Sequence, residues 1–172
     1  ARQNMQVVER IEMKGRLLGG CMDCLVNLTG TRFDRVTEFA ERYANDGILW
    51  FLEACDLNLM SIRRAIWQMK HAGWFSHVKG FLIGRPLCRD EEMFGLDRYR
   101  AVTDLLAEYQ VPVVVDLDIG HLPPMMPLVC GGTAEVTLTG FATDDSVPSV
   151  PVSPDDGSQR EKEGVPDEGD FI

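Results

Sequence analysis

Two side chains with acid–base chemistry follow apolar runs of this sequence. Glu53 ends the run ILWFLE (48–53), and His121 lies in the loop DIGHLPPMMP that follows the run VPVVVDLD. In parallel α/β sheets, sites lie just beyond the carboxyl ends of the strands, so neighbouring strands would bring these two residues to one edge. A carboxylate that accepts a hydrogen bond from an imidazole orients the ring and stabilises the imidazolium formed in general-base catalysis. Glu53 and His121 are therefore candidates for the acid and base of a nucleophile–His–acid triad.

Structural roles for the same two residues stay open at this stage. A glutamate at a strand end can instead pair with Arg63 or Arg64, or cap the helix that begins near Asn58. A loop histidine before two prolines can simply brace that loop. Three further acidic residues compete with Glu53 for the role of the acid: Asp56, Asp116 and Asp118.

The cysteines offer two alternative chemistries. Cys21 and Cys24 form a C-x-x-C motif, which occurs in redox pairs and as half of a zinc site. A zinc site needs about two further ligands, and the sequence has no second C-x-x-C. His71 and His77 have H-x₅-H spacing, but they flank Gly73-Trp74 at a helix end, where cationic or capping roles suffice. We therefore interpret these thiols mainly as packing residues and predict no metal site. Cys55 is an alternative nucleophile for a Cys–His–acid site, but on one strand it would share a face with Glu53 and crowd it.

Arg85 is a candidate substrate-binding residue. It follows the strand candidate KGFLIG (79–84) and so belongs to the same carboxyl edge of the sheet. A guanidinium can bind a substrate carboxylate through two parallel hydrogen bonds. An ion pair with Asp90 or Glu91 is the competing structural role.

The elements that must position these residues alternate along the chain. Helical apolar spacing separates the short apolar runs, a pattern typical of βαβ units and a largely parallel sheet. The fold class predicted is α/β, a mixed, mostly parallel sheet with flanking helices. Its central strands are predicted at 48–53, 79–84 and 111–117. Two outer strands are predicted as well: one at 5–12, followed by a turn at Lys14-Gly15, and an edge or antiparallel strand at 134–140. Helices are predicted over 31–45, 58–73 and 96–109.

Composition narrows the class of protein further. The 172 residues suffice for one domain with a real core, and no apolar run approaches the roughly 18 residues needed to span a membrane. Five cysteines, an odd number without a regular framework, favour free thiols in the cytoplasm. The formal net charge is −10, without a basic stripe, so neither nucleic acid nor a membrane is an expected partner.

Most of the charge lies in a tail that differs from the rest of the chain. Residues 143–172 contain nine acidic and two basic residues, so they contribute −7 of the net charge. Pro148, Pro151 and Pro154 recur every third residue among few large apolar ones, which predicts an extended, disordered segment. A peptide ligand for a partner is the alternative. The predicted domain boundary thus divides 1–142 from 143–172.

Several segments of the chain resemble a known family. The segments GRLLGGCMDCLVNLTGTRFD, ILWFLEACDLNLMSIRRAIWQ, GWFSHVKGFLIGRPL and VPVVVDLDIGHLPPMMPLVCG are together similar to the C-terminal half of the LD-carboxypeptidases. This family includes muramoyltetrapeptide carboxypeptidases and the microcin C self-immunity peptidases. The resemblance covers most of residues 10–140, and its most specific motifs are FLE and GHLPPMMP.

The resemblance implies a fold and a division of labour between two domains. The fold expected is a swivelling β/β/α-type domain, in which Glu53 and His121 supply the acid and base of a Ser–Glu–His triad. Gly19 and Gly20 correspond to the family's glycine turn near the active site and, with Arg85, are expected to bind substrate. The activity implied is cofactor-independent cleavage of the L,D bond before the terminal D-alanine of murein tetrapeptide, during peptidoglycan recycling in bacteria.

The sequence departs from the family in having no serine elbow such as G-x-S-x-G. The resemblance implies that the nucleophilic serine belongs to an N-terminal domain missing here, and that the chain alone is inactive. A self-immunity peptidase acting on a peptidyl nucleotide, or a non-catalytic binding module, are the alternatives. A cut docking face predicts exposed apolar surface near 17–20, 123–126 and Trp74, and self-association of the chain, for example as a homodimer.

Overall fold

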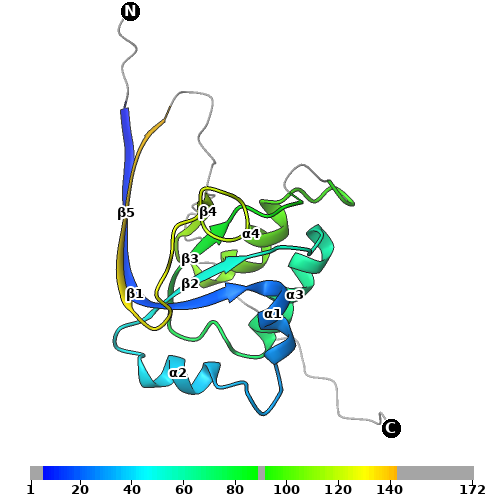
Figure 1. Cartoon of the computed structure of the whole chain (residues 1–172). Helices are drawn as coiled ribbons and strands as arrows, with labels where there is room; N and C mark the ends of the chain where they lie inside the picture. Colours follow the sequence, from blue (N-terminus) through cyan, green and yellow to red (C-terminus); the bar gives the residue numbers. More distant parts are fainter. Residues whose placement is uncertain (1–5, 89–91, 143–172) are drawn as a thin grey trace, which may run out of the picture.

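The computed structural model describes residues 6–88 and 92–142, which build one five-stranded sheet of order β4-β3-β2-β1-β5 (Figure 1). Strands β1, β2, β3 and β4 run parallel, whereas β5 pairs with β1 in the antiparallel sense. The predicted mixed, mostly parallel sheet is therefore confirmed. The strands are β1 (Gln6–Cys21), β2 (Ile48–Glu53), β3 (Val78–Gly84), β4 (Val113–Leu117) and β5 (Thr133–Ala142).

Short helices connect the strands. They are α1 (Met22–Leu25), α2 (Val36–Arg42), α3 (Leu59–His71) and α4 (Arg100–Leu106), with 3-10 turns η1 (Val26–Leu28) and η2 (Ala107–Tyr109). Asn58 caps the start of α3, and its side chain accepts a hydrogen bond from the Ser61 N–H at 2.9 Å. Within the described residues, no helix is long and apolar enough to cross a membrane.

The sheet separates two apolar cores. On one face, Ile48, Trp50 and Leu52 of β2 pack with the buried sides of α3 and α4. On the other face, Leu49 packs with residues of the curled β1–β5 ribbon and of the loop that follows β4. Because side chains alternate along a strand, Glu53 lies on the same face of the sheet as Leu49. The helices thus cover one face, and the side chain of Glu53 points to the other.

Strand β1 is longer than the sequence predicts. The predicted turn at Lys14-Gly15 is wrong, because the strand continues through it and pairs with β5 on one side. On the other side, β1 passes so close to the loop before β2 that a Cβ on Gly15 would lie 2.9 Å from the Gly47 carbonyl oxygen. The glycine at position 15 therefore permits a close strand contact instead of making a turn.

The predicted helices at 31–45 and 96–109 are shorter in the structure because acidic side chains hold the preceding residues in turns. Asp34 accepts hydrogen bonds from the N–H groups of Gly30 and Val36, and α2 begins only after it. Similarly, Asp97 accepts hydrogen bonds from the N–H groups of two residues that follow it, and α4 and η2 together cover 100–109. Such local side-chain bonds compete with helix formation.

The expected exposure of Trp74 is also wrong. Its side chain is fully buried, stacks on Trp50 with ring centroids 5.9 Å apart, and donates a hydrogen bond to Asp34. By contrast, the expectation holds in part for the segment after His121, where Met125 and Met126 are 61% and 52% exposed. The predicted tail at 143–172 and the alternative partners Asp90 and Glu91 lie outside the described residues.

Candidate active site

Glu53 is held rigidly at the carboxyl end of β2. It is 7% exposed, and it is the only polar residue classed as buried in the described part of the chain. Two glycines leave room for it: a Cβ on Gly84 would lie 2.9 Å from the Glu53 Cβ, and one on Gly120 would lie 2.8 Å from its Oε2. The carboxylate is therefore fixed by close backbone packing on two sides.

His121 reaches this carboxylate from the loop after β4. Its Nδ1–H donates a hydrogen bond to Glu53 Oε2 at 2.8 Å, since an ionised carboxylate can only accept. The hydrogen bond that His121 donates to Glu53 and the negative charge of that carboxylate raise the pKa of His121 above its ordinary value. The side chain of His121 is 48% exposed, so an incoming group can reach the imidazole from solvent. The predicted proximity of the two residues is therefore observed.

The route by which they meet differs from the prediction. Strands β2 and β4 are not neighbours, because β3 lies between them. The loop after β4 crosses the end of β3 at Gly84, where a Cβ would lie 2.3 Å from the Ile119 carbonyl oxygen. The absence of a side chain at Gly84 thus allows His121 to reach across one strand to Glu53.

Arg85 holds the segment 118–132 between β4 and β5, which carries His121 and is called the histidine loop below. Its guanidinium forms an ion pair with Asp118 at 2.7 Å and donates hydrogen bonds to the carbonyl oxygens of Leu122 and Pro124. The Met126 N–H in turn donates to the Asp118 carbonyl oxygen at 2.7 Å. These contacts show that Arg85 braces the loop from both sides of His121. Its substrate-binding role stays a prediction.

Gly19 and Gly20 lie in β1 beside the last residues of β2. Both have φ angles near +150°, in a region that residues with a side chain rarely adopt. A Cβ on Gly19 would lie 1.8 Å from the Phe51 carbonyl oxygen, so the two strands approach too closely for any other residue. The register that follows places Cys21 opposite Glu53. The glycines therefore shape this edge of the sheet, and their contact with substrate remains predicted.

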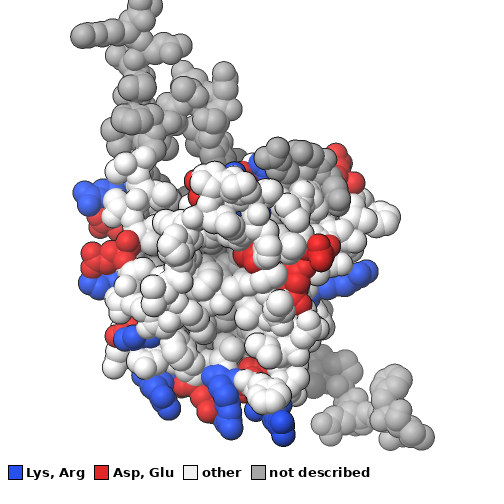
Figure 2. Space-filling model, in the orientation of Figure 1, with Lys and Arg blue, Asp and Glu red and all other residues white. Residues whose placement is uncertain are grey.

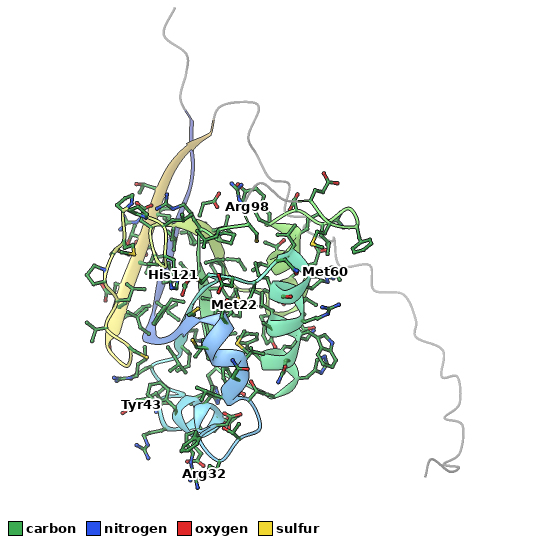
Figure 3. All side chains as sticks on the ribbon, turned by 45° about the vertical axis from the view of Figure 1, so that its right-hand side comes forward. Met22, Arg32, Tyr43, Met60, Arg98 and His121 are labelled. Atoms are coloured by element: carbon green, nitrogen blue, oxygen red, sulfur yellow. The ribbon has the colours of Figure 1, made fainter. Side chains whose placement is uncertain are left out.

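Cys21 is the residue near the pair that the sequence analysis missed. Ligand atoms of Cys21, Glu53 and His121 all lie within 4.8 Å of one another. Burial, followed by hydrogen bonds to Glu53 and Asp23, raises the pKa of the Cys21 thiol to about 12, so the thiol keeps its proton. Figure 3 labels His121 and Met22, the residue next to Cys21, at this edge of the sheet. The signal in the sequence is the position of Cys21 directly after the glycine pair Gly19-Gly20.

Cys55 does not belong to this cluster. Burial and the charge of Asp56 raise the pKa of its thiol, which is the opposite of what a thiolate nucleophile requires. Its backbone N–H and that of Asp56 instead donate to the Asp23 carboxylate at 3.0 and 2.7 Å. The alternative of a Cys55–His121–Glu53 site is therefore not supported. Asp23 was also missed, and it ties the loop after β2 to α1.

Comparison with known proteins identifies the family of this chain. The family model of the LD-carboxypeptidase C-terminal domain matches residues 14–136. The chain belongs to this family. Among curated relatives, YocD of Bacillus subtilis is 27% identical over 131 residues, which are 76% of this chain and 38% of that protein. The microcin C7 self-immunity protein MccF of Escherichia coli is 26% identical over 120 residues, 70% of this chain and 33% of MccF.

Solved structures show the same fold. Muramoyltetrapeptide carboxypeptidase from Oxalobacter formigenes superposes with a TM-score of 0.56 at 21% identity, over 77% of this chain and 43% of that one. MccF in complex with aspartyl sulfamoyl adenosine gives a TM-score of 0.61 at 19% identity, over 81% of this chain and 41% of that one. The chain thus spans about two fifths of the length of the proteins it matches.

Proposed function

We propose that this chain is the C-terminal catalytic half of a serine-type LD-carboxypeptidase that removes the terminal D-alanine from murein tetrapeptide. Residues 1–142 would form this half, and 143–172 a tail appended to it. The observation that carries the proposal is the hydrogen bond of His121 Nδ1 to the buried carboxylate of Glu53, on an imidazole that is half exposed to solvent. Membership of the family supports the reaction class.

In this proposal a second domain, N-terminal in the complete protein, supplies the serine. Its hydroxyl attacks the carbonyl of the L,D bond while His121 Nε2 takes the hydroxyl proton, and Glu53 stabilises the imidazolium. His121 then gives that proton to the amine of the leaving D-alanine, so that the C–N bond breaks. Water, activated by the same imidazole, hydrolyses the acyl-enzyme. The 172 residues alone are expected to be inactive, because they lack the nucleophile.

A second substrate class is favoured by a specific observation. MccF is among the relatives, and two of its solved structures hold glutamyl sulfamoyl guanosine or aspartyl sulfamoyl adenosine. The same Glu53–His121 pair would serve cleavage of a peptidyl nucleotide equally well, since the acid–base chemistry of the amide bond is unchanged.

The place of action proposed for the tetrapeptide reaction is the bacterial cytoplasm, during peptidoglycan recycling.

The test compares both substrates with the protein encoded by the complete reading frame. We expect release of D-alanine from murein tetrapeptide with kcat/KM at least about tenfold above that for an aminoacyl sulfamoyl adenosine, a difference of about 1.4 kcal/mol. The reverse ratio would assign the protein to self-immunity. Hydrolysis of neither substrate, by a folded protein, would contradict the peptidase proposal and favour a binding module.

A further inference from the structure

Three side chains of different chemistry converge where β1 and β2 end. Cys21 closes β1 and Glu53 closes β2, and the parallel register sets these two residues opposite each other. His121 completes the group from the loop after β4, with its Nδ1 2.8 Å from Glu53 Oε2. One ligand atom from each residue lies within 4.8 Å of the other two. We propose that Cys21, Glu53 and His121 form a binding site for a zinc ion.

The donor set decides the metal. A thiolate, an imidazole nitrogen and a carboxylate oxygen are the three ligand types that Zn²⁺ uses, whereas Mg²⁺ and Ca²⁺ prefer oxygen alone. Tetrahedral zinc requires neighbouring ligand atoms about 3.3–3.8 Å apart, as follows from Zn–ligand distances of about 2.0–2.3 Å. The Nδ1–Oε2 pair must therefore open slightly to admit the ion, and the thiol must close on it. A water molecule would fill the fourth position beside the exposed imidazole.

The surroundings favour a cation. The Asp23 carboxylate lies 3.3 Å from the Cys21 Sγ, and Asp56 also acts on His121 electrostatically. The negative charges around the thiol attract a divalent ion, which displaces the thiol proton when it binds. That proton goes to solvent, and the proton on His121 Nδ1 moves to Nε2. The S–H bond is exchanged for an S–Zn bond, and the net charge of the site rises by one.

The geometry is already largely fixed. Glu53 is wedged against Gly84 and Gly120, and Arg85 braces the loop that carries His121. Preorganised ligands bind a metal more tightly because fewer side chains must be ordered on binding. Cys21 lies two residues after Gly19, whose close approach to Phe51 of β2 holds the strand end in place. Only small side-chain rotations are therefore needed to close the site.

A zinc ion here would also inhibit the enzyme. This consequence rests on the proposed function, since the ion would occupy His121 Nδ1 and replace the hydrogen bond that orients the base. A protonated Nε2 can no longer accept a proton from serine. The site thus couples peptide hydrolysis to the free zinc concentration, and metal binding can be measured without any substrate.

The experiment titrates Zn²⁺ and Co²⁺ into the reduced 172-residue chain. We expect one tightly bound zinc per chain in competition with a chromophoric chelator, and a near-ultraviolet thiolate-to-Co²⁺ charge-transfer band. Cys21→Ser should abolish the band and weaken zinc binding by about 100-fold or more. Cys24→Ser is the matched control, because Cys24 is the exposed partner of the same C-x-x-C motif, and it should change neither readout. Circular dichroism and thermal melting of each variant establish that it is folded.

Equal zinc affinity in the wild type and in Cys21→Ser would overturn the proposal. So would a charge-transfer band that disappears in Cys24→Ser, which would place the metal on another thiol. In the complete protein, zinc should lower the rate of hydrolysis, measured for each variant against its own metal-free rate. This loss should be smaller in Cys21→Ser than in the wild type. If the complete protein binds zinc but hydrolyses neither substrate, the metal site is supported and the peptidase proposal is rejected. If it hydrolyses a substrate but binds no zinc, the peptidase proposal is supported and the metal site is rejected.

Discussion

At the scale of single residues, Gly120 controls whether the loop after β4 can approach the carboxylate of Glu53. Its φ angle is +106°, and a Cβ would lie within 3.0 Å of three atoms of the Glu53 side chain. Both the backbone conformation and the lack of space therefore require glycine. The hydrogen bond of His121 depends on this contact because the two residues are adjacent in the chain.

We predict that Gly120→Ala destabilises the chain by about 2–4 kcal/mol, from backbone strain together with overpacking. Gly131→Ala is the matched control, since Gly131 also has a positive φ angle, of +83°, but no atom within 4 Å of its Cβ position. The control should cost about 1 kcal/mol. Urea denaturation measures both free energies of unfolding. Equal losses in the two variants would mean that the contact with Glu53 contributes nothing.

At the scale of secondary structure elements, Asp34 ties the segment before α2 to the segment that follows α3. Burial alone would raise the pKa of Asp34, but hydrogen bonds from the Gly30 N–H, the Trp74 indole and the Val36 N–H lower it below its usual value. A carboxylate with a lowered pKa stabilises the folded state above its unfolded pKa of about 3.9. This contribution disappears as the pH falls through the folded pKa.

Asp34→Ala should therefore lower the free energy of unfolding by about 1–3 kcal/mol at pH 7, because charge-assisted hydrogen bonds are lost. The difference from the wild type should shrink as the pH falls below about 4, where the carboxyl group becomes protonated. Glu38→Ala is a suitable control, since this residue carries an exposed ion pair on α2. A difference that stays constant from pH 7 to pH 3 would contradict the role of the charge.

The elements also show which parts of the fold a sequence can and cannot predict. The strand at Ile48–Glu53 was predicted to the residue, because a run buried on both faces carries a clear apolar signal. The continuous strand β1 was missed, because Gly15 has the composition of a turn and its close contact with Gly47 is a tertiary feature. Helix starts were misplaced wherever an aspartate bound the backbone of its own loop.

The candidate site was predictable only where strand ends mark it. Glu53 and His121 lie at or after the ends of apolar runs, and this position alone indicates them as candidates. The position of Cys21 beside them depends on the register of β1 with β2, which the sequence does not specify. Cys55 was considered instead because it is close to Glu53 in the chain. Closeness in the chain does not place Cys55 beside the pair, because its thiol is in contact with Asp56 instead.

At the scale of the whole molecule, the histidine loop presents apolar surface. Met125, Met126 and Val129 are each more than half exposed, and Figure 2 shows a face with a hollowed, mostly uncharged middle and basic side chains over α2. Large exposed apolar patches usually mark interfaces, and these three exposed side chains lie in the loop that carries His121. A second domain that carries the nucleophile would have to approach His121 over this loop.

We predict that the chain self-associates through the histidine loop, and that association increases with salt. The 143–172 tail, of net charge −7, should oppose association by repulsion, which salt screens over about 10 Å at 0.1 M. Replacing Met125 and Met126 by Gln should reduce association, whereas Phe33→Gln should not, although Phe33 is 65% exposed near α2. Sedimentation velocity, with and without 143–172, gives the result. A monomer under all these conditions would rule out this interface.

The kinetics of the complete protein test the central claim, that Glu53 and His121 form the acid–base half of a serine triad. With murein tetrapeptide as substrate, His121→Ala should lower kcat by about 10³-fold or more, and Glu53→Gln by about 10²–10⁴-fold, with little change in KM. The effects of the two substitutions on kcat should also be non-additive, so that the double variant has nearly the same kcat as His121→Ala alone. Turnover near the wild-type rate in either single variant would contradict the assignment.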